Sequence, residues 1–152
     1  QLGECLHVLR GHKERVTGLA RLDRERLISS SVDRLFIIWD IQTGERLHTI
    51  ELPSPILCLG AADGYIVLGL MDGRVLAWEA KDAGKAPSQI LSCDAHRGAV
   101  RTLYFPVKDV LLTGGGDGLV KFWDLKNGGP AVGNRYNVGG RSVVHTFKVC
   151  QA

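Results

Sequence analysis

This chain of 152 residues lacks several patterns that would indicate a membrane protein or a helical protein. No apolar run reaches the roughly 18 residues that a membrane-spanning helix needs, and the polar start at Gln1 is not typical of a signal peptide. No segment shows the apolar period of about 3.6 residues that marks an amphipathic helix. We therefore expect no membrane association and a structure built from β-strands.

The cysteines lack the spacing of a metal or redox site. They lie at positions 5, 58, 93 and 150, with neither a C-x-x-C pair nor a paired histidine motif, so we expect no metal and no other cofactor. Cys5, Cys58 and Cys150 fall within apolar strand patterns, which favour small buried side chains with reduced thiols. Reduced cysteines are typical of a cytoplasmic or nuclear protein.

Strong charge and phosphate-binding motifs are missing as well. The 19 Lys and Arg residues nearly balance the 16 Asp and Glu residues, and a net charge of +3 is too small to indicate a general nucleic-acid binder. The glycine-rich run at 114–118 is not followed by the Lys-Ser/Thr pair of a phosphate-binding loop, so it predicts a tight turn between two strands. Nucleic acid is therefore not the expected partner.

The chain does contain an internal repeat. Trp39-Asp40 returns as Trp123-Asp124, 84 residues later, and Trp78-Glu79 lies between them at intervals of 39 and 45 residues. A period of about 40 to 45 residues that ends in Trp-Asp predicts β-propeller blades, each a four-stranded sheet. Because a propeller closes with about four to eight blades, we expect the remaining blades to come from the same or another polypeptide.

Apolar patterns and turn residues predict four strands in each repeat. The predicted strands are 16–20, 26–30, 35–39 and 46–50, then 56–59, 65–69, 75–78 and 88–91, then 100–104, 110–113, 119–123 and 134–138. Outside the repeats, 5–9 is predicted to be the last strand of a preceding blade and 142–147 the first strand of a following blade. The chain is thus one propeller segment, with blades at 11–51, 52–93 and 94–139 flanked by end strands within 1–10 and 140–152.

Two repeats carry the same four side-chain types at the same spacing. They are His12, Ser29, Asp33 and Trp39 in the first repeat, and His96, Thr113, Asp117 and Trp123 in the third. With these residues the chain resembles the WD-repeat β-propeller family over essentially its whole length. The resemblance implies an all-β propeller segment of three four-stranded blades with one partial-blade strand at each end. It also implies that each set of four is a buried, hydrogen-bonded structural tetrad.

A catalytic interpretation of the tetrads is disfavoured. His12, Ser29 and Asp33 could be taken for a hydrolase triad, but a triad needs an exposed serine oxygen beside oxyanion-hole donors. This set recurs and includes a tryptophan donor, so we predict no catalytic, cofactor-binding or metal-binding residue and no enzyme activity. The middle repeat departs from the pattern, because Leu68 replaces the hydroxyl residue and no histidine lies at 51–55, although Asp72 is kept.

The resemblance implies a non-catalytic scaffold that binds peptides or protein domains where the fourth-to-first loops and second-to-third turns emerge. Six cationic residues are predicted on that face: Arg10, Lys13, Arg15, Arg34, Arg74 and Arg97. Guanidinium groups pair well with carboxylates and phosphates, which favours acidic or phosphorylated protein segments as partners. Two alternatives are an ordinary solvated surface with pairs such as Glu14 to Arg15 or Arg34 to Glu25, and an RNA- or ribonucleoprotein-associated propeller subunit.

Overall fold

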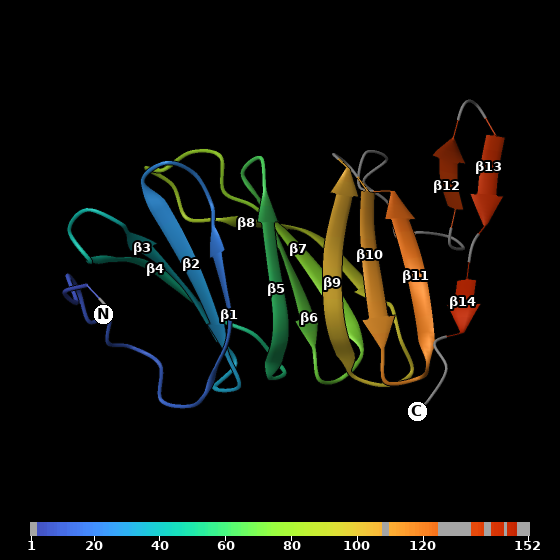
Figure 1. Ribbon diagram of the computed structural model, residues 1–152, viewed down its shortest axis with the longest axis horizontal. Coiled ribbons are helices and arrows are strands. Elements are labelled where there is room, and N and C mark those ends of the chain that lie inside the picture. The colour runs from blue at the N-terminus through green and yellow to red at the C-terminus, as the bar shows by residue number, and fades with distance from the viewer. Residues whose placement is uncertain (1–2, 108–109, 125–134, 139–140, 145, 149–152) are drawn as a thin grey trace.

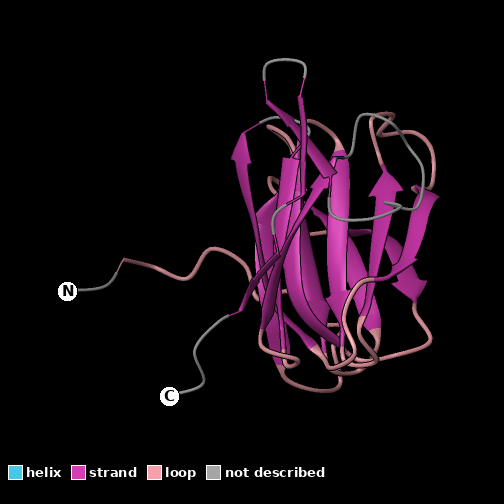
Figure 2. Ribbon diagram, turned by 90° about the vertical axis from the view of Figure 1, so that its right-hand side faces the viewer, coloured by secondary structure: helices cyan, strands magenta, loops and turns pink. Residues whose placement is uncertain are grey.

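A computed structural model describes all residues except 1–2, 108–109, 125–134, 139–140, 145 and 149–152. The regular structure of the described residues consists of β-strands and connecting loops (Figure 2), which confirms the all-β prediction. A search of the same residues finds no helix of the length and apolarity needed to cross a membrane.

Three four-stranded antiparallel sheets stand in a row (Figure 1). The first sheet contains β1 (Val16–Arg21), β2 (Arg26–Ser31), β3 (Leu35–Asp40) and β4 (Arg46–Glu51), and the middle sheet contains β5 (Ile56–Ala62), β6 (Tyr65–Leu70), β7 (Arg74–Glu79) and β8 (Ser88–Asp94). The third sheet contains β9 (Val100–Val107), β10 (Val110–Gly115), β11 (Leu119–Asp124) and β14 (Thr146–Lys148). Strands β1 to β11 each begin within one residue of their predicted starts, because β-branched runs and turn residues mark them clearly.

The last strand of the third sheet differs from the prediction. The segment 134–138 does not pair with β11; β12 (Arg135–Val138) instead pairs with β13 (Arg141–Val144) in a separate two-stranded sheet. Strand β14 occupies the position beside β11, so assigning 142–147 to a following blade is also wrong. The physical reason is that residue alternation defines a strand but not its neighbour. The sequence between β12 and β13, Gly139-Gly140, is moreover of the kind that favours a two-residue hairpin.

The segment before the first repeat is not a strand, contrary to the prediction for 5–9. A strand needs a neighbour for its backbone groups, and no described strand pairs with this segment. It runs past the β3–β4 turn instead, where His7 Nε2 lies 3.0 Å from the carbonyl oxygen of Gln42. Cys5 is therefore exposed and not buried as expected, whereas burial raises the pKa of the Cys58 thiol to about 12. The prediction for Cys150 lies outside the described residues.

The apolar core lies in two layers between the sheets. The first layer packs side chains such as Phe36 and Ile38 of the first sheet against Leu68 and Leu70 of the middle sheet. The second layer packs the opposite face of the middle sheet, including Val67, against the third sheet. The middle sheet is thus covered on both faces, while the first and third sheets each have one face turned away from the other described sheets (Figure 1).

Candidate functional site

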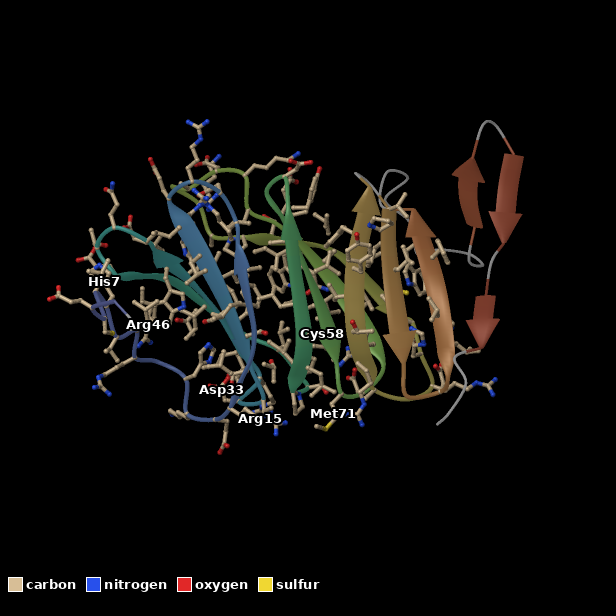
Figure 3. All side chains as sticks on the ribbon, viewed as in Figure 1. His7, Arg15, Asp33, Arg46, Cys58 and Met71 are labelled. Carbon is tan, nitrogen blue, oxygen red and sulfur yellow. The ribbon has the colours of Figure 1, made fainter. Side chains whose placement is uncertain are left out.

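The candidate site is the edge of the molecule where the second-to-third turns of each sheet meet the loops that lead into β1, β5 and β9. We call this edge the loop face. It forms the lower side of Figure 3, where Arg15, Asp33 and Met71 all lie. The six predicted cations and the histidines and aspartates of the two tetrads come from the turns, loops and strand ends around it, while the hydroxyl and tryptophan residues of the tetrads lie within the strands.

Four side chains of the first sheet form one hydrogen-bonded chain beneath the loop face. His12 Nδ1 lies 3.0 Å from Asp33 Oδ2, and His12 Nε2 lies 2.8 Å from Ser29 Oγ. The indole nitrogen of Trp39 donates to the same Ser29 oxygen at 2.8 Å. The loop before β1, the β2–β3 turn and β3 are thereby tied together by side chains.

The third sheet repeats this arrangement with a threonine in place of the serine. His96 Nδ1 lies 2.9 Å from Asp117 Oδ1, and its Nε2 lies 2.8 Å from Thr113 Oγ1. Trp123 donates its indole N–H to Thr113 Oγ1 at 2.8 Å. The structure therefore brings together all eight residues of the two tetrads that the spacing picked out.

Each tetrad aspartate also fixes the backbone on the loop face. Asp33 accepts the backbone N–H groups of Lys13 and Leu35, both at 2.9 Å, and Asp117 accepts those of Arg97 at 3.1 Å and Leu119 at 3.2 Å. Burial acts to raise the pKa of both carboxyls, but these donors and the histidines outweigh it and hold both pKa values below the ordinary range. The aspartates are therefore anions that position the residue after each histidine.

The tetrads are too deeply buried to act on a substrate. Ser29 is 3% exposed and Thr113 is 1% exposed, so neither hydroxyl oxygen can reach a bound molecule. Burial also lowers the pKa of His96, although its hydrogen bond to Asp117 opposes the shift, so the ring is neutral near pH 7. Among the residues that the structure describes, no group of His, Cys, Asp and Glu is arranged to hold a metal ion.

The middle sheet lacks a tetrad. Asp72 is not joined to a histidine; it binds the side chain of Arg74 two residues away, with oxygen to nitrogen distances of 2.9 and 2.7 Å. Leu68 stands where the other sheets have Ser29 and Thr113, and the indole nitrogen of Trp78 is buried without a hydrogen-bond partner. The lost hydroxyl leaves this donor unsatisfied.

The six predicted cations divide into paired and unpaired groups. Arg34 pairs with Glu51 at 2.9 Å, and not with Glu25, while Arg74 pairs with Asp72. The other four have no ion pair with any carboxylate in the described part of the chain: Arg10, Lys13, Arg15 and Arg97. All four are exposed, so these cations are accessible to an anionic partner, although the loop face also carries the carboxylates of Glu14, Glu51, Asp72 and Asp94.

Arg34 has an unusual backbone conformation that the sequence analysis missed. Its φ is 73°, in the left-handed region, while glycines fill the same position of the other two turns: Gly73 with φ 91° and Gly118 with φ 79°. The missed signal lies in the sequence, since the residue after the turn aspartate is glycine in two repeats and arginine in the first. The apolar side chain of Met71, 48% exposed beside the middle turn, also escaped notice.

Comparison with known proteins identifies the family. A family model described as "WD domain, G-beta repeat" matches residues 3–40 and 87–124, which together make up half of the chain. The chain belongs to this WD-repeat family. The two matched stretches contain the two tetrads, and they leave out most of the middle repeat, which lacks one.

Among related sequences, a guanine nucleotide-binding protein subunit beta of Oryza sativa subsp. indica is 30% identical over 133 residues, covering 80% of this chain and 34% of the relative. Regulator of rDNA transcription protein 13 of Saccharomyces cerevisiae is 26% identical over 147 residues, covering 82% of this chain and 77% of the relative. The chain thus spans about a third of the length of its guanine nucleotide-binding relatives.

Solved structures show the same fold. The structure of U3-55K superposes with a TM-score of 0.76 and 26% identity, covering 95% of this chain and 42% of the other. The computationally designed Ika4 protein superposes with a TM-score of 0.74 and 24% identity, covering 98% of this chain and all of the designed one. The predicted resemblance to WD-repeat propellers is therefore confirmed.

Proposed function

We propose that this chain is a non-catalytic scaffold of the cytoplasm or nucleus that binds acidic segments of other proteins on its loop face. WD-repeat proteins act as protein-interaction scaffolds, the tetrad hydroxyls are buried, and no group of His, Cys, Asp and Glu among the described residues is arranged to hold a metal ion. Binding must then rest on the exposed side chains of the loop face.

Arg34 is the observation that carries the proposal. A side chain in the left-handed region costs about 1 kcal/mol relative to glycine, and such strained positions cluster at functional sites. The ion pair of Arg34 with Glu51 is exposed on both sides and contributes little stability to offset that cost. A role in binding an anionic group accounts for an arginine where the other repeats have glycine.

The surroundings of Arg34 favour several separate carboxylates along a segment over a single phosphate. Lys13 and Arg15 precede the first sheet and Arg97 precedes the third, so the unpaired cations stand on both sides of the middle sheet. Exposed Met71 lies on the middle sheet between them and offers an apolar contact. The tetrad aspartates already hold the backbone of Lys13 and Arg97, which lowers the ordering cost of binding.

The proposal is tested by fluorescence anisotropy with a fluorescein-labelled poly-glutamate peptide. We expect Arg34→Gly to bind this peptide about tenfold more weakly, because one charge-assisted hydrogen bond is removed. The same variant is expected to gain about 0.5 kcal/mol in free energy of unfolding, measured by urea denaturation, since glycine relieves the strained turn. Weaker binding by a more stable protein separates the binding role from any folding role.

Arg24→Gly is the matched control, because Arg24 is an exposed arginine in the β1–β2 loop, on the opposite edge of the same sheet. It loses the same charge and should keep its affinity. Equal losses in both variants would mean unspecific charge attraction and would contradict the proposal. Tighter binding of a single-stranded RNA probe, with a steep salt dependence, would support the ribonucleoprotein alternative instead.

A further inference from the structure

Glu51 already occupies Arg34, the arginine on which the proposed binding depends. Glu51 Oε1 accepts a hydrogen bond from Arg34 Nη2 at 2.9 Å. Within the described part of the chain, this is the single hydrogen bond of the Arg34 side chain, although a guanidinium offers five N–H donors. A ligand carboxylate that binds Arg34 along the Nη2 side must therefore displace the Glu51 carboxylate.

The backbone on both sides of this ion pair is fixed. The carbonyl oxygen of Arg34 accepts the N–H of buried Leu52 at 2.8 Å, so β4 ends beside the turn. The tetrad carboxylate of Asp33 accepts the N–H of Leu35 at 2.9 Å, and Leu35 pairs across the sheet with Glu51. Only the two side chains therefore have to move when the ion pair opens.

Both side chains are exposed enough to separate. The side chain of Arg34 is 50% exposed and that of Glu51 is 63% exposed, so water can solvate each of them. An exposed ion pair of this kind changes an equilibrium constant by at most about fivefold. A ligand carboxylate that forms a two-pronged contact with the guanidinium gains more than this one hydrogen bond provides.

The middle sheet has no equivalent of this ion pair. Asp94 of β8 occupies the position of Glu51, but the left-handed position of the turn beside it is Gly73. Arg74 binds Asp72 instead, through two nitrogen atoms at 2.9 and 2.7 Å, and these side chains are only 32% and 36% exposed. Of the two ion-paired cations on the loop face, only the one in the first sheet is held by a single, well-exposed contact.

We propose that Glu51 is an internal competitor, which occupies Arg34 in the free protein and is displaced by a carboxylate of the bound acidic segment. This inference rests on the proposed function, because it concerns the same ligand and the same arginine. A ligand that offers only one hydrogen bond exchanges like for like and gains little at Arg34. Glu51 therefore lowers the affinity of the loop face and favours carboxylates that can bind the guanidinium in the two-pronged manner.

Two substitutions of Glu51 separate competition from a general effect of charge, measured by fluorescence anisotropy with the fluorescein-labelled poly-glutamate peptide. Glu51→Gln removes the competing anion, and we expect it to bind the peptide about threefold to fivefold more tightly. Glu51→Asp keeps the net charge but is one methylene too short to hold Arg34 at the same distance. We expect it to bind at least about twofold more tightly.

Glu14→Gln is the matched control, because Glu14 is an exposed carboxylate of the loop face with no ion pair in the described part of the chain. It should change the affinity by less than about twofold. Equal gains in Glu14→Gln and Glu51→Gln, with none in Glu51→Asp, would overturn the inference in favour of a general charge effect. A gain from Glu51→Gln that persists in the Arg34→Gly background would also overturn it.

Chemical labelling tests the same contact without the peptide. Phenylglyoxal modifies accessible guanidinium groups, and mass spectrometry can follow Arg34 with Arg24 as an internal reference. Both Glu51 variants should label Arg34 at least about twofold faster than the wild type and leave Arg24 unchanged. Unchanged labelling of Arg34 in both variants would overturn the inference, whatever the peptide does. Absence of poly-glutamate binding by the wild type and both variants would instead contradict the proposed function, and faster labelling would still support the masking of Arg34 by Glu51.

Discussion

The first and third sheets differ from the middle sheet in how their turns are held. Each outer sheet of the row has a complete His–Asp–hydroxyl–Trp tetrad, whereas the middle sheet has an aspartate paired with its local Arg74 and a tryptophan whose N–H has no partner. The outer sheets are also those with one face turned away from the other described sheets. In the third sheet the tetrad nevertheless lies on the covered face, since Trp123 belongs to the core layer shared with the middle sheet.

Neighbouring sheets take over part of the tetrad's role in the middle sheet. The Trp78 ring packs edge-on against Phe36 of the first sheet, with ring centroids 5.4 Å apart. Arg26, only 3% exposed, reaches from β2 to the carbonyl oxygen of Ala80 just after β7, at 2.5 Å. The middle sheet thus keeps its turn and strands in place despite one unsatisfied indole N–H, a loss of about 1 to 3 kcal/mol.

The largest expected change in stability comes from removing the turn aspartate, either from a sheet with a tetrad or from the middle sheet. Asp33→Ala should lower the free energy of unfolding by about 2 kcal/mol, because buried His12 and two backbone N–H groups lose their acceptor. Asp72→Ala should cost about 0.5 kcal/mol, since Asp72 binds a partly exposed arginine and its own turn. Urea denaturation of both variants measures the difference.

Hydrogen exchange locates the effect of the same pair of variants. Asp33→Ala should lower protection in β2 and β3, while Asp72→Ala should leave β6 and β7 protected, because the middle sheet does not depend on its aspartate. Equal losses of stability, or unchanged protection in β2 and β3, would show that the tetrad does not hold the outer sheet.

Acidification should weaken the third sheet by a smaller amount. The pKa of His96 is lower in the folded protein than its unfolded value of 6.5, chiefly through burial, so the unfolded state takes up the proton more readily. Its stabilising contribution is therefore fully present above pH 6.5 and is lost as the pH falls through the folded pKa. Protonation keeps the Asp117 contact but removes the acceptor of the Thr113 hydroxyl, which limits the loss.

The measurement is the free energy of unfolding across this pH range, for the wild type and for His96→Gln. The wild type should lose stability below pH 6.5 more steeply than the variant, which has no titrating group at this position. His48→Gln, at a half-buried histidine of β4 outside the tetrads, is the matched control variant. Parallel slopes for the wild type and His96→Gln would disprove the role of His96.

Most of the fold was predictable because each repeat supplies its own evidence. Strand starts, turns and tetrad spacing are local or recurring patterns, and they place β1 to β11 and bring His12 to Asp33 correctly. Strand partners at the ends were not predictable, since residue alternation in 134–138 or 5–9 does not tell which strand, if any, offers free backbone groups.

The site was less predictable because it depends on differences between repeats. The strained Arg34 is visible only when its turn is compared with those of Gly73 and Gly118. Residue charge alone predicted six partner-binding cations, yet Arg34 and Arg74 form ion pairs with Glu51 and Asp72 in the free protein. Such pairings depend on the loop geometry, which spacing does not fix.

The smallest expected effect comes from restoring part of a tetrad to the middle sheet. Leu68→Thr places a hydroxyl where Ser29 and Thr113 lie in the other sheets, within the reach that those sheets show for their tryptophans. The Trp78 N–H should then gain a hydrogen-bond acceptor worth about 1 kcal/mol, which partly offsets the loss of the leucine's apolar packing.

Leu70→Thr is the matched control, because Leu70 is equally buried in the same strand and core layer. We expect urea denaturation to show that Leu68→Thr costs about 1 kcal/mol less than Leu70→Thr, and that Trp78→Phe erases this advantage. If the two threonine variants cost the same, the unsatisfied indole nitrogen does not limit the stability of the middle sheet.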